Sequence, residues 1–426
     1  MIKLRLTVCL FFLWTICASA QTVNDSRWRE VFTDPELRAL IDTALTNNVD
    51  IRTAIARVEQ ADATLRMARL SLLPTVSVGG EGNVSKAKGS VVTSEYSIPV
   101  RLQWEVSLSG RFSAKKKAAE SLLWSAEETE RAVRLQVVTS VASQYYTLLM
   151  LDEQLAITRE SVENARRTVE VMEALKEAGM QNEAAVAQAR TAWLSGASAE
   201  KTLQQQIGAG ESALMLLLGQ QRENIGRSTK APDRLPLDYT AAYPLQSLSE
   251  RPDVKASEYA LAASLAQMDV AHSAFYPTLS ITASLNPLDM LTEAVASLVQ
   301  PLFSAGRNKG DLRIAKAAYE ESLASFTQTL LVAGTELRDA LSACNYSSER
   351  IALRKQEVEA AGKACEASEA LMHSGSATYL EVLSAQATLL QSRLSLAADR
   401  LDLLQGQINL YKALGGNLLL SLQENR

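Results

Sequence analysis

The chain has 426 residues, of which 47% are hydrophobic, 21% charged and 5% aromatic, and its formal net charge is −5. A mildly acidic chain has no electrostatic footprint for nucleic acid, so we expect no nucleic-acid partner. Two long tracts without proline, 100–231 and 302–426, argue for an elongated, mainly helical shape rather than a set of compact domains.

Residues 1–20 predict an export signal, because a basic start precedes an apolar run and Ala18-Ser19-Ala20 offers a small-residue cleavage site. The alternative is a lipid-anchored Cys17, although Thr15 and Ile16 before it are not the small residues expected there. No later segment has about 18 consecutive apolar residues, so we predict no transmembrane helix. An exported chain of this kind is a soluble periplasmic or secreted protein, or a β-barrel.

The first repeat is predicted over 21–218, and it begins with helices. Asp34-Pro35-Glu36 opens an amphipathic helix, with Asp34 as the N-cap and Pro35 in the first turn. An alanine-rich helix follows from Asp50 and ends before Pro74.

After Pro74 the apolar period changes to two, which predicts strands at about 75–85 and 95–108. An apolar face on a strand long enough to cross a bilayer, with aromatic residues near its ends, is typical of a membrane barrel. A half-buried strand of a soluble sandwich is the alternative reading. The predicted lipid-facing residues are Tyr96, Ile98, Val100, Leu102, Trp104, Val106 and Leu108.

Residues 111–218 predict one long helical hairpin that turns at Gly179. Apolar residues at spacings of three and four, from Leu148 to Met172, form a coiled-coil seam. An arm from Arg111 to the turn would be about 100 Å long. Residues 219–250 carry three prolines, with a fourth just beyond at Pro252, and read as an irregular connector.

The pattern then repeats over 251–418, followed by a tail at 419–426. Pro277 stands 203 residues after Pro74, and Gly375 stands 196 after Gly179. The second copy therefore predicts a helix, strands at about 278–285 and 294–302, and a hairpin over 307–414. Four strands per chain cannot close a barrel, so we expect chains to pool strands into one barrel and hairpins into one bundle.

Residues that could carry chemistry are scarce. Cys344 and Cys365 lie about 30 Å apart on one predicted helix, too far for a disulfide. His272 and His373 are the only histidines and have no metal-ligand spacing. We therefore expect no enzyme, no metal and no cofactor.

An ordered set of motifs, found in both halves, resembles the outer-membrane factor family, the TolC-like exit ducts of Gram-negative bacteria, and most closely its branch serving resistance-nodulation-division efflux pumps. The resemblance covers the whole mature chain. Its motifs are Phe32-Thr33-Asp34-Pro35-Glu36-Leu37, Ala56-Arg57-Val58-Glu59-Gln60-Ala61, Leu73-Pro74-Thr75, Leu108-Ser109-Gly110-Arg111, Arg251-Pro252-Asp253-Val254, Tyr276-Pro277-Thr278-Leu279-Ser280 and Gln300-Pro301-Leu302-Phe303 with Gly306-Arg307.

The resemblance implies a homotrimer with one outer-membrane β-barrel, four strands per chain, continued by a coiled-coil periplasmic tunnel. Its hairpin tips would meet a periplasmic adaptor protein and an inner-membrane efflux transporter. The tip residues are Gly179, Met180, Gln181, Asn182, Gly375, Ser376, Ala377 and Thr378.

Family members often carry two acids, three residues apart, around a closed aperture at the second tip. Here Glu381 matches the first acid and Ser384 replaces the second, while Ala185 and Gln188 hold the corresponding places in the first hairpin. A double acidic ring is therefore not expected. The resemblance implies an efflux exit duct gated at its tips; the alternatives are a type I secretion duct of the same fold, a periplasmic coiled-coil adaptor, or an enzyme with helical arms.

Overall fold

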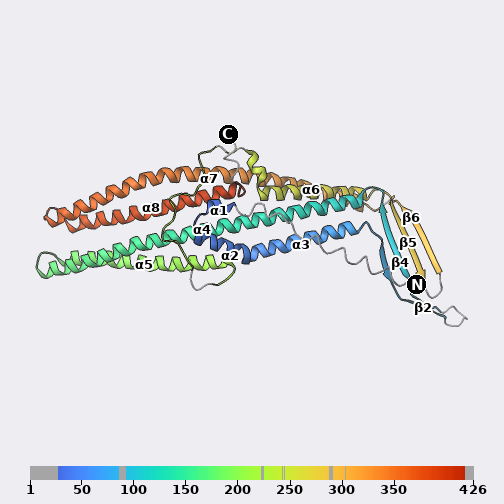
Figure 1. Cartoon of the computed structure of the whole chain (residues 1–426), viewed down its shortest axis with the longest axis horizontal. Helices are drawn as coiled ribbons and strands as arrows, with labels where there is room; N and C mark the ends of the chain where they lie inside the picture. The colour runs from blue at the N-terminus through green and yellow to red at the C-terminus, as the bar shows by residue number, and fades with distance from the viewer. Residues whose placement is uncertain are drawn as a thin grey trace, which may run out of the picture.

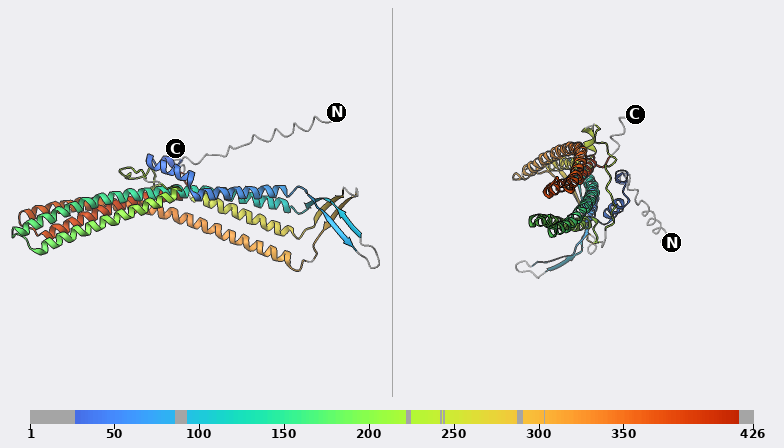
Figure 2. Two further views of the ribbon diagram at one scale, coloured as in Figure 1. Left: turned by 90° about the horizontal axis from the view of Figure 1, so that it is seen from below. Right: turned by 90° about the vertical axis from the view of Figure 1, so that its left-hand side faces the viewer.

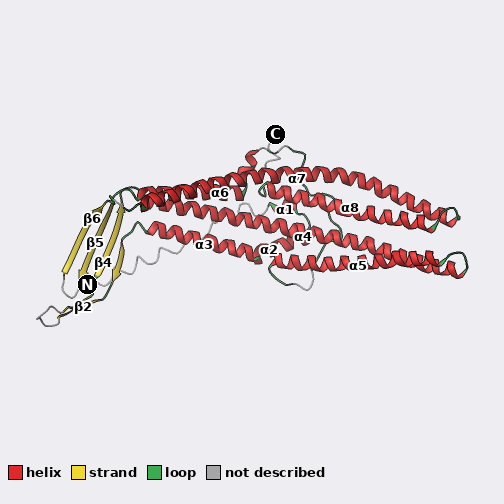
Figure 3. Ribbon diagram, turned by 180° about the vertical axis from the view of Figure 1, so that it is seen from behind, coloured by secondary structure: helices red, strands yellow, loops and turns green. Residues whose placement is uncertain are grey.

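The structure is a computed structural model that describes residues 27–85, 93–221, 225–241, 243, 245–286, 291–302 and 304–417. The predicted signal peptide, Cys17 and the tail at 419–426 lie outside the described residues. The molecule is a long rod of helices with a small sheet at one end and two hairpin tips at the other (Figures 1 and 3). No described helix combines the length and apolarity needed to cross a membrane.

The first hairpin consists of α4 (Arg111–Glu177) and α5 (Glu183–Leu218). Before it come α1 (Trp28–Val31), α2 (Pro35–Asn47) and α3 (Val49–Leu70). The predicted N-cap is present, because Asp34 Oδ1 accepts from Glu36 N at 2.9 Å. α2 is the amphipathic helix predicted to open at Asp34-Pro35-Glu36, and the short α1 precedes it, separated from it by residues 32–34.

The second half contains α6 (Pro252–Ser273), α7 (Arg307–His373) and α8 (Tyr379–Ala413). The connector before it is irregular apart from one 3-10 helix, η1 (Leu245–Glu250). Viewed along the rod, the two hairpins lie beside one another (Figure 2).

The short helices are joined end to end to the returning arms. α3 continues the line of α5 toward the sheet, and α6 continues the line of α8 (Figure 1). At the first joint Asn48 Nδ2 donates to Leu217 O at 2.8 Å, and at the second Arg251 Nη1 donates to Ala413 O at 3.2 Å. These side chains satisfy carbonyls that a helix end leaves without an intrahelical partner.

The hydrophobic core lies midway along the rod, where α1, α2, α4, α5, α8 and the connector meet. Tyr145 and Tyr146 are fully buried there. The Tyr145 hydroxyl donates to Asp34 Oδ2 at 2.7 Å and accepts from Ser228 N at 3.0 Å, which ties the connector to α2 and α4. Fully buried Gln407 holds the connector on α8 through both Leu235 N and Leu235 O.

Glycines let α4 and α5 approach closely. A Cβ at Gly196 would lie 2.9 Å from Val162 Cγ2, and one at Gly210 would lie 2.8 Å from Leu148 Cδ2. The glycines that interrupt the apolar seam of α5 are therefore sites of close helix packing.

The main sheet has the order β1-β4-β5-β6, and all of its pairs are antiparallel. Its strands are β1 (Thr75–Val78), β4 (Val100–Ser107), β5 (Thr278–Asn286) and β6 (Leu291–Val299). A second ladder pairs β2 (Glu81–Ser85) with β3 (Thr93–Ser97).

Three strand predictions differ from the structure. The strands predicted at 75–85 and 95–108 are each interrupted, at Gly79-Gly80 and at Ile98-Pro99, because Pro99 has no N–H for the ladder. Gly79 N still donates to Pro99 O at 3.1 Å, so the two ladders form one bent hairpin. The strand predicted at 294–302 runs from 291 to 299 and stops before Gln300-Pro301.

Candidate functional site

The sheet separates apolar and polar side chains in β1, β4 and β5, and less strictly in β6. Residues directly opposite in an antiparallel pair share a face, and successive residues alternate. On β4, Val100, Leu102, Trp104 and Val106 therefore share one face. Their neighbours on that face are Val76 and Val78 of β1, Leu279, Ile281, Ala283 and Leu285 of β5, and Ala294, Ala296 and Leu298 of β6.

The opposite face is rich in hydroxyl and charged groups. It carries Arg101, Gln103, Glu105 and Ser107 of β4, opposite Ser284, Thr282, Ser280 and Thr278 of β5. Tyr96, on β3, is opposite Gly82 and covers it, since a Cβ there would lie 3.4 Å from the ring. Ile98 lies at the interruption and Leu108 just beyond β4; both are exposed. One sheet therefore presents a mainly nonpolar surface on one side. The other side is hydrophilic apart from Val295 and Val299 of β6.

At the other end of the rod, the first tip turns through a Schellman motif. Gly179 has φ +74°, Gly179 N donates to Lys176 O, and Met180 N donates to Leu175 O at 2.8 Å. Asn182 then caps α5, with its Oδ1 accepting from Ala185 N at 3.0 Å. Met180 is 67% exposed and Gln181 is exposed, so the turn presents its side chains to solvent.

The second tip repeats this geometry 196 residues later. Gly375 has φ +75°, Gly375 N donates to Met372 O, and Ser376 N donates to Leu371 O at 2.9 Å. After Ala377, Thr378 caps α8 in a capping box: its backbone N donates to Glu381 Oε2 at 2.8 Å, and its side chain accepts from Glu381 N.

The four predicted aperture residues lie at one level in the two hairpins, but their environments differ. Glu381, Ser384 and Gln188 are exposed, whereas Ala185 is buried. One oxygen of the Glu381 carboxylate is occupied by the cap, a role that sequence reasoning missed although the Thr-x-x-Glu spacing that begins at Thr378 signals it. Ala185 marks the level of the predicted aperture without presenting a surface to it.

An apolar cluster holds the two tips together. Tyr379 of α8 packs with Val169 and Met172 of α4 and with Val186 and Ala189 of α5, and Ala185 belongs to the same cluster. Farther along, Arg393 of α8 pairs with Glu160 of α4 at 2.9 Å, and Arg400 pairs with Glu153 at 3.1 Å. The hydrogen bond from Arg393 holds the pKa of Glu160 below its usual value. The hairpins are therefore attached to each other along α4 and α8.

Ion pairs join the arms of the first hairpin up to its turn. Lys176 pairs with Glu183, which lowers the pKa of that carboxyl group, and Glu173 pairs with Arg190. Arg159 and Glu200 form a third pair at 3.0 Å. Opposite charges at similar distances on either side of the Gly179 turn were the signal in the sequence that could have identified these pairs.

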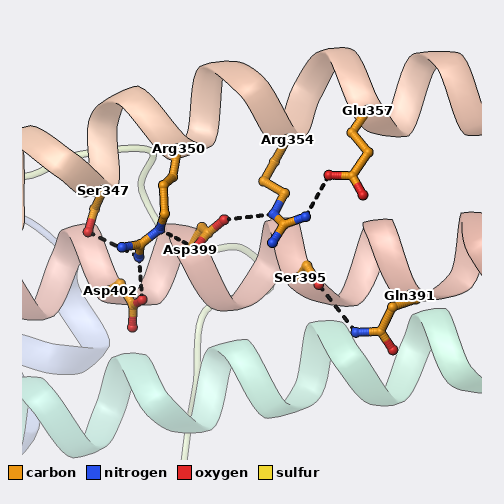
Figure 4. Close-up of polar contacts among 8 residues, drawn as sticks. All are labelled: Ser347, Arg350, Arg354, Glu357, Gln391, Ser395, Asp399 and Asp402. Carbon is orange, nitrogen blue, oxygen red and sulfur yellow. Dashed lines mark hydrogen bonds and ion pairs between the residues drawn. The ribbon is translucent and has the colours of Figure 1, made fainter.

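The second hairpin is joined by a different cluster, farther from its turn (Figure 4). Asp399 of α8 accepts from Arg350 Nε at 2.8 Å and from Arg354 Nε at 3.2 Å, while Arg350 also pairs with Asp402 at 2.6 Å and Arg354 with Glu357. Arg354 is 21 residues from Gly375, or about 31 Å along the helix.

Closer to the second tip, polar attachment between the arms is sparse. Between Glu357 and the turn at Gly375, no ion pair joins α7 to α8 among the side chains that the structure describes. One hydrogen bond does join the two arms there, from Gln386 Nε2 to Glu369 Oε1 at 2.9 Å. The end of the second hairpin thus depends mainly on apolar contacts.

The cysteines and histidines are not gathered into a site. Cys344 and Cys365 are free and buried, and burial raises the pKa of each thiol to about 11. Within the described ranges, no group of three or more His, Cys, Asp and Glu residues could hold a metal ion.

Comparison with known proteins agrees with this geometry. A family model for outer membrane efflux proteins matches residues 40–220 and 244–416. The chain is 29% identical to the cation efflux system protein CusC of Escherichia coli, over 93% of this chain and 90% of that protein. It is 31% identical to the toluene efflux pump outer membrane protein TtgC of Pseudomonas putida, over 91% of this chain and 84% of that protein. A crystal structure of CusC matches with a TM-score of 0.86 and 28% identity, over 92% of this chain and 94% of that chain.

A sheet with one apolar face, continued by two long helical hairpins, defines an outer-membrane channel protein with a barrel part and a helical tunnel part. Both halves of the chain carry this design, and the family model covers each of them. The chain belongs to the outer membrane efflux protein family. The relatives and structural neighbours are channels and not enzymes.

Proposed function

We propose that this protein is the outer-membrane exit duct of a tripartite efflux system, a passive homotrimeric channel. The observation that carries the proposal is that one long rod has an amphipathic sheet at one end and two exposed helical turns at the other. The sheet suits a bilayer and the turns suit contact with periplasmic partners. The inner-membrane transporter supplies the energy, and a periplasmic adaptor connects it to the duct. We assign the duct no catalytic activity.

The edges of the sheet support the trimer. In the order β1-β4-β5-β6, the strands β1 and β6 each have one side without a partner strand in the described part of this chain. An open edge is not tolerated in a bilayer, because its N–H and C=O groups would be left unsatisfied. Three chains that pair β1 with the β6 of a neighbour would close a barrel of twelve strands, with the apolar face of β4 toward lipid.

Efflux is favoured over type I secretion by the relatives. CusC is named for cation efflux and TtgC for toluene efflux, yet this chain is almost equally similar to both. Similar channels that serve cargoes of such different chemistry support the inference that the channel wall is not selective for its cargo. Selection of the cargo then belongs to the transporter and its adaptor.

We propose that the periplasmic aperture lies at the level of Glu381 and Ser384, with Gln188 nearby and Ala185 buried beneath. The turns at 179–182 and 375–378 form the contact surface for the adaptor. Because ion pairs reach the first turn but stop about 31 Å from the second, the second hairpin supplies the movement that opens the duct. The first hairpin, fixed by Lys176–Glu183 and Glu173–Arg190, serves as the stationary wall.

Two measurements test this function. Purified protein should run as a heat-modifiable trimer and conduct ions across a planar bilayer. With the photo-reactive residue at Met180 or Ala377, cross-linking should capture a tagged periplasmic adaptor; the same residue at exposed Lys230, midway along the rod, is the control. A monomeric protein in the soluble periplasmic fraction, or capture only from position 230, would overturn the proposal.

A further inference from the structure

The two longest helices begin in an unusual way. α4 and α7 have no acidic residue in the first turn, whereas α2, α3, α5, α6 and α8 each have one. Acidic side chains are favourable at a helix N-terminus because of the helix dipole, and basic ones are unfavourable. α4 and α7 instead carry basic residues there, and they are the helices that begin beside the sheet.

Each repeat carries four of these basic residues, although only two pairs, Arg111 with Arg307 and Lys117 with Arg313, stand at equivalent positions. The first eleven residues of α4 contain Arg111, Lys115, Lys116 and Lys117, and those of α7 contain Arg307, Lys309, Arg313 and Lys316. Each set of eleven also includes a single acid, Glu120 in α4 and Asp311 in α7.

The charge is concentrated at the sheet end of the rod. The eleven residues nearest the sheet in α3, α4, α6 and α7 together hold ten Lys and Arg and four Asp and Glu, a net charge of +6. The eleven residues nearest the tips in α4, α5, α7 and α8 hold four Lys and Arg and seven Asp and Glu, a net charge of −3. The whole chain is acidic, so the excess of basic residues beside the sheet is local.

Most of these cations have no anionic partner. Arg66, Arg69, Arg111 and Arg307 form ion pairs with nearby acids. Within the described part of the chain, no ion pair is formed by the remaining six, which are Lys115, Lys116, Lys117, Lys309, Arg313 and Lys316. Lys117 and the three basic residues of α7 are exposed. Neighbouring exposed cations repel one another modestly, and an external anion would relieve this repulsion.

Exposed apolar residues lie between the basic helix ends and the strands of the sheet. Leu72 and Leu73, between α3 and β1, are 47% and 59% exposed, and Leu302, between β6 and α7, is 92% exposed. The Trp104 indole N–H donates to Leu72 O at 3.0 Å, which places the aromatic ring at the same level. In membrane proteins, aromatic and apolar residues lie at the edge of the hydrocarbon core, and Lys and Arg lie next to them at the level of the headgroups.

We propose that these six residues form a cationic collar that binds the anionic headgroups of phospholipids in the periplasmic leaflet of the outer membrane. The inference rests on the proposed barrel. α4 begins four residues after β4 ends, so its first turns lie at headgroup depth. Long lysine side chains can reach upward to phosphate groups while their stems cover apolar surface. In a trimer the collar would repeat three times around the barrel, and it would fix the depth of the barrel in the membrane.

Lipid retention tests the collar. Purified trimer is incubated in detergent with equimolar phosphatidylglycerol and phosphatidylcholine, and the retained lipid is measured by mass spectrometry. We expect the wild type to prefer phosphatidylglycerol at least about fivefold, the effect of one cation near an anionic surface, and to lose the preference in high salt. Lys115→Gln, Lys116→Gln and Lys117→Gln combined with Lys309→Gln, Arg313→Gln and Lys316→Gln should bring the ratio near one.

The control combines Lys201→Gln, Lys230→Gln and Lys355→Gln, which removes three exposed cations far from the sheet. It should keep the preference, whereas losing half as much charge would reduce the preference if position were unimportant. An equal retention of both lipids by the wild type would overturn the proposal, and so would a preference that survives in the sixfold variant. A changed ion selectivity of the channel with unchanged lipid retention would place the cations in the lumen, which also overturns it. Normal conductance of the sixfold variant separates failure of the collar from failure of the duct.

Discussion

Asn48 and Arg251 stand at equivalent positions of the two repeats and make the same contact. Each donates from its side chain to the carbonyl of a residue in the last turn of the returning arm, Asn48 to Leu217 and Arg251 to Ala413. Asn48 precedes Arg251 by 203 residues and Leu217 precedes Ala413 by 196, the offsets of the repeat itself. An amide group in the first repeat and a guanidinium group in the second therefore make the same end-to-end link between two helices.

Replacing Asn48 should loosen the first joint. Asn48 Oδ1 caps α3 by accepting from Asp50 N and Ile51 N, in addition to the bond to Leu217. We expect Asn48→Ala to lower the free energy of unfolding by about 1–2 kcal/mol, because the N-terminal donors of α3 lose their partner. Asn47→Ala, at an exposed position, is the control. Chemical unfolding of the detergent-solubilised protein measures both, and equal effects would contradict this role.

Gly219 should be the least replaceable of the left-handed glycines at helix ends. Its φ is +66°, and a Cβ there would lie 2.4 Å from Asn47 O, whereas Gly179 has φ +74° and open space around it. Gly179→Ala should cost about 1–2 kcal/mol of backbone strain. Gly219→Ala should cost more, because the backbone of α5 must also move away from α2. Melting temperatures of the two variants decide this, and similar values would argue against the close approach.

Two substitutions at Glu381 separate its charge from its cap. A glutamine keeps the capping box but removes the charge, while an alanine removes both. If the charge lines the aperture, Glu381→Gln and Glu381→Ala should each lower the cation selectivity of trimers in planar bilayers. If only Glu381→Ala alters conductance, the carboxylate acts by capping α8, and the aperture assignment is wrong. Glu183→Gln in the first hairpin serves as the comparison, since Glu183 is also exposed near a turn.

Asp399 should limit the opening of the second hairpin. It is 8% exposed and accepts from two arginines of α7, so Asp399→Asn leaves both guanidinium groups partly unpaired. We expect a loss of about 1–3 kcal/mol in unfolding free energy and a larger mean conductance. Asp402→Asn breaks one exposed ion pair and should cost less than about 1 kcal/mol. Conductance that is unchanged in Asp399→Asn would exclude this attachment from gating.

The register of the sheet predicts which side tolerates charge. Leu102 lies on the apolar face, opposite Ala283 and Val76, while its neighbour Gln103 lies on the polar face. Leu102→Arg should cost about 2–4 kcal/mol in the bilayer and reduce the trimer seen on a heat-modifiability gel. Trp104→Asp should act in the same direction. Gln103→Asp, one residue away, should assemble normally; the reverse result would place lipid on the other face.

Much of the fold was predictable because its signals are local. The turns at Gly179 and Gly375 need a residue that accepts positive φ, and the coiled-coil seams extend over several heptads. The strand interruption at Pro99 was equally local, since proline has no N–H, but alternation of apolar residues on both sides concealed it. The capping box at Thr378 is also a local signal, because its Thr and Glu stand three residues apart.

By itself the sequence determined the order of the elements, the two repeats and the apolar faces of β1, β4 and β5, since periodicity, proline and glycine act within a few residues. Only the tertiary structure decided which helices lie side by side. That choice brings Asn48 to Leu217 and Tyr379 to Val169, and it places Asp399 between two arginines of α7. Such contacts join residues from 45 to more than 200 positions apart, and no local pattern in the chain specifies partners at that separation.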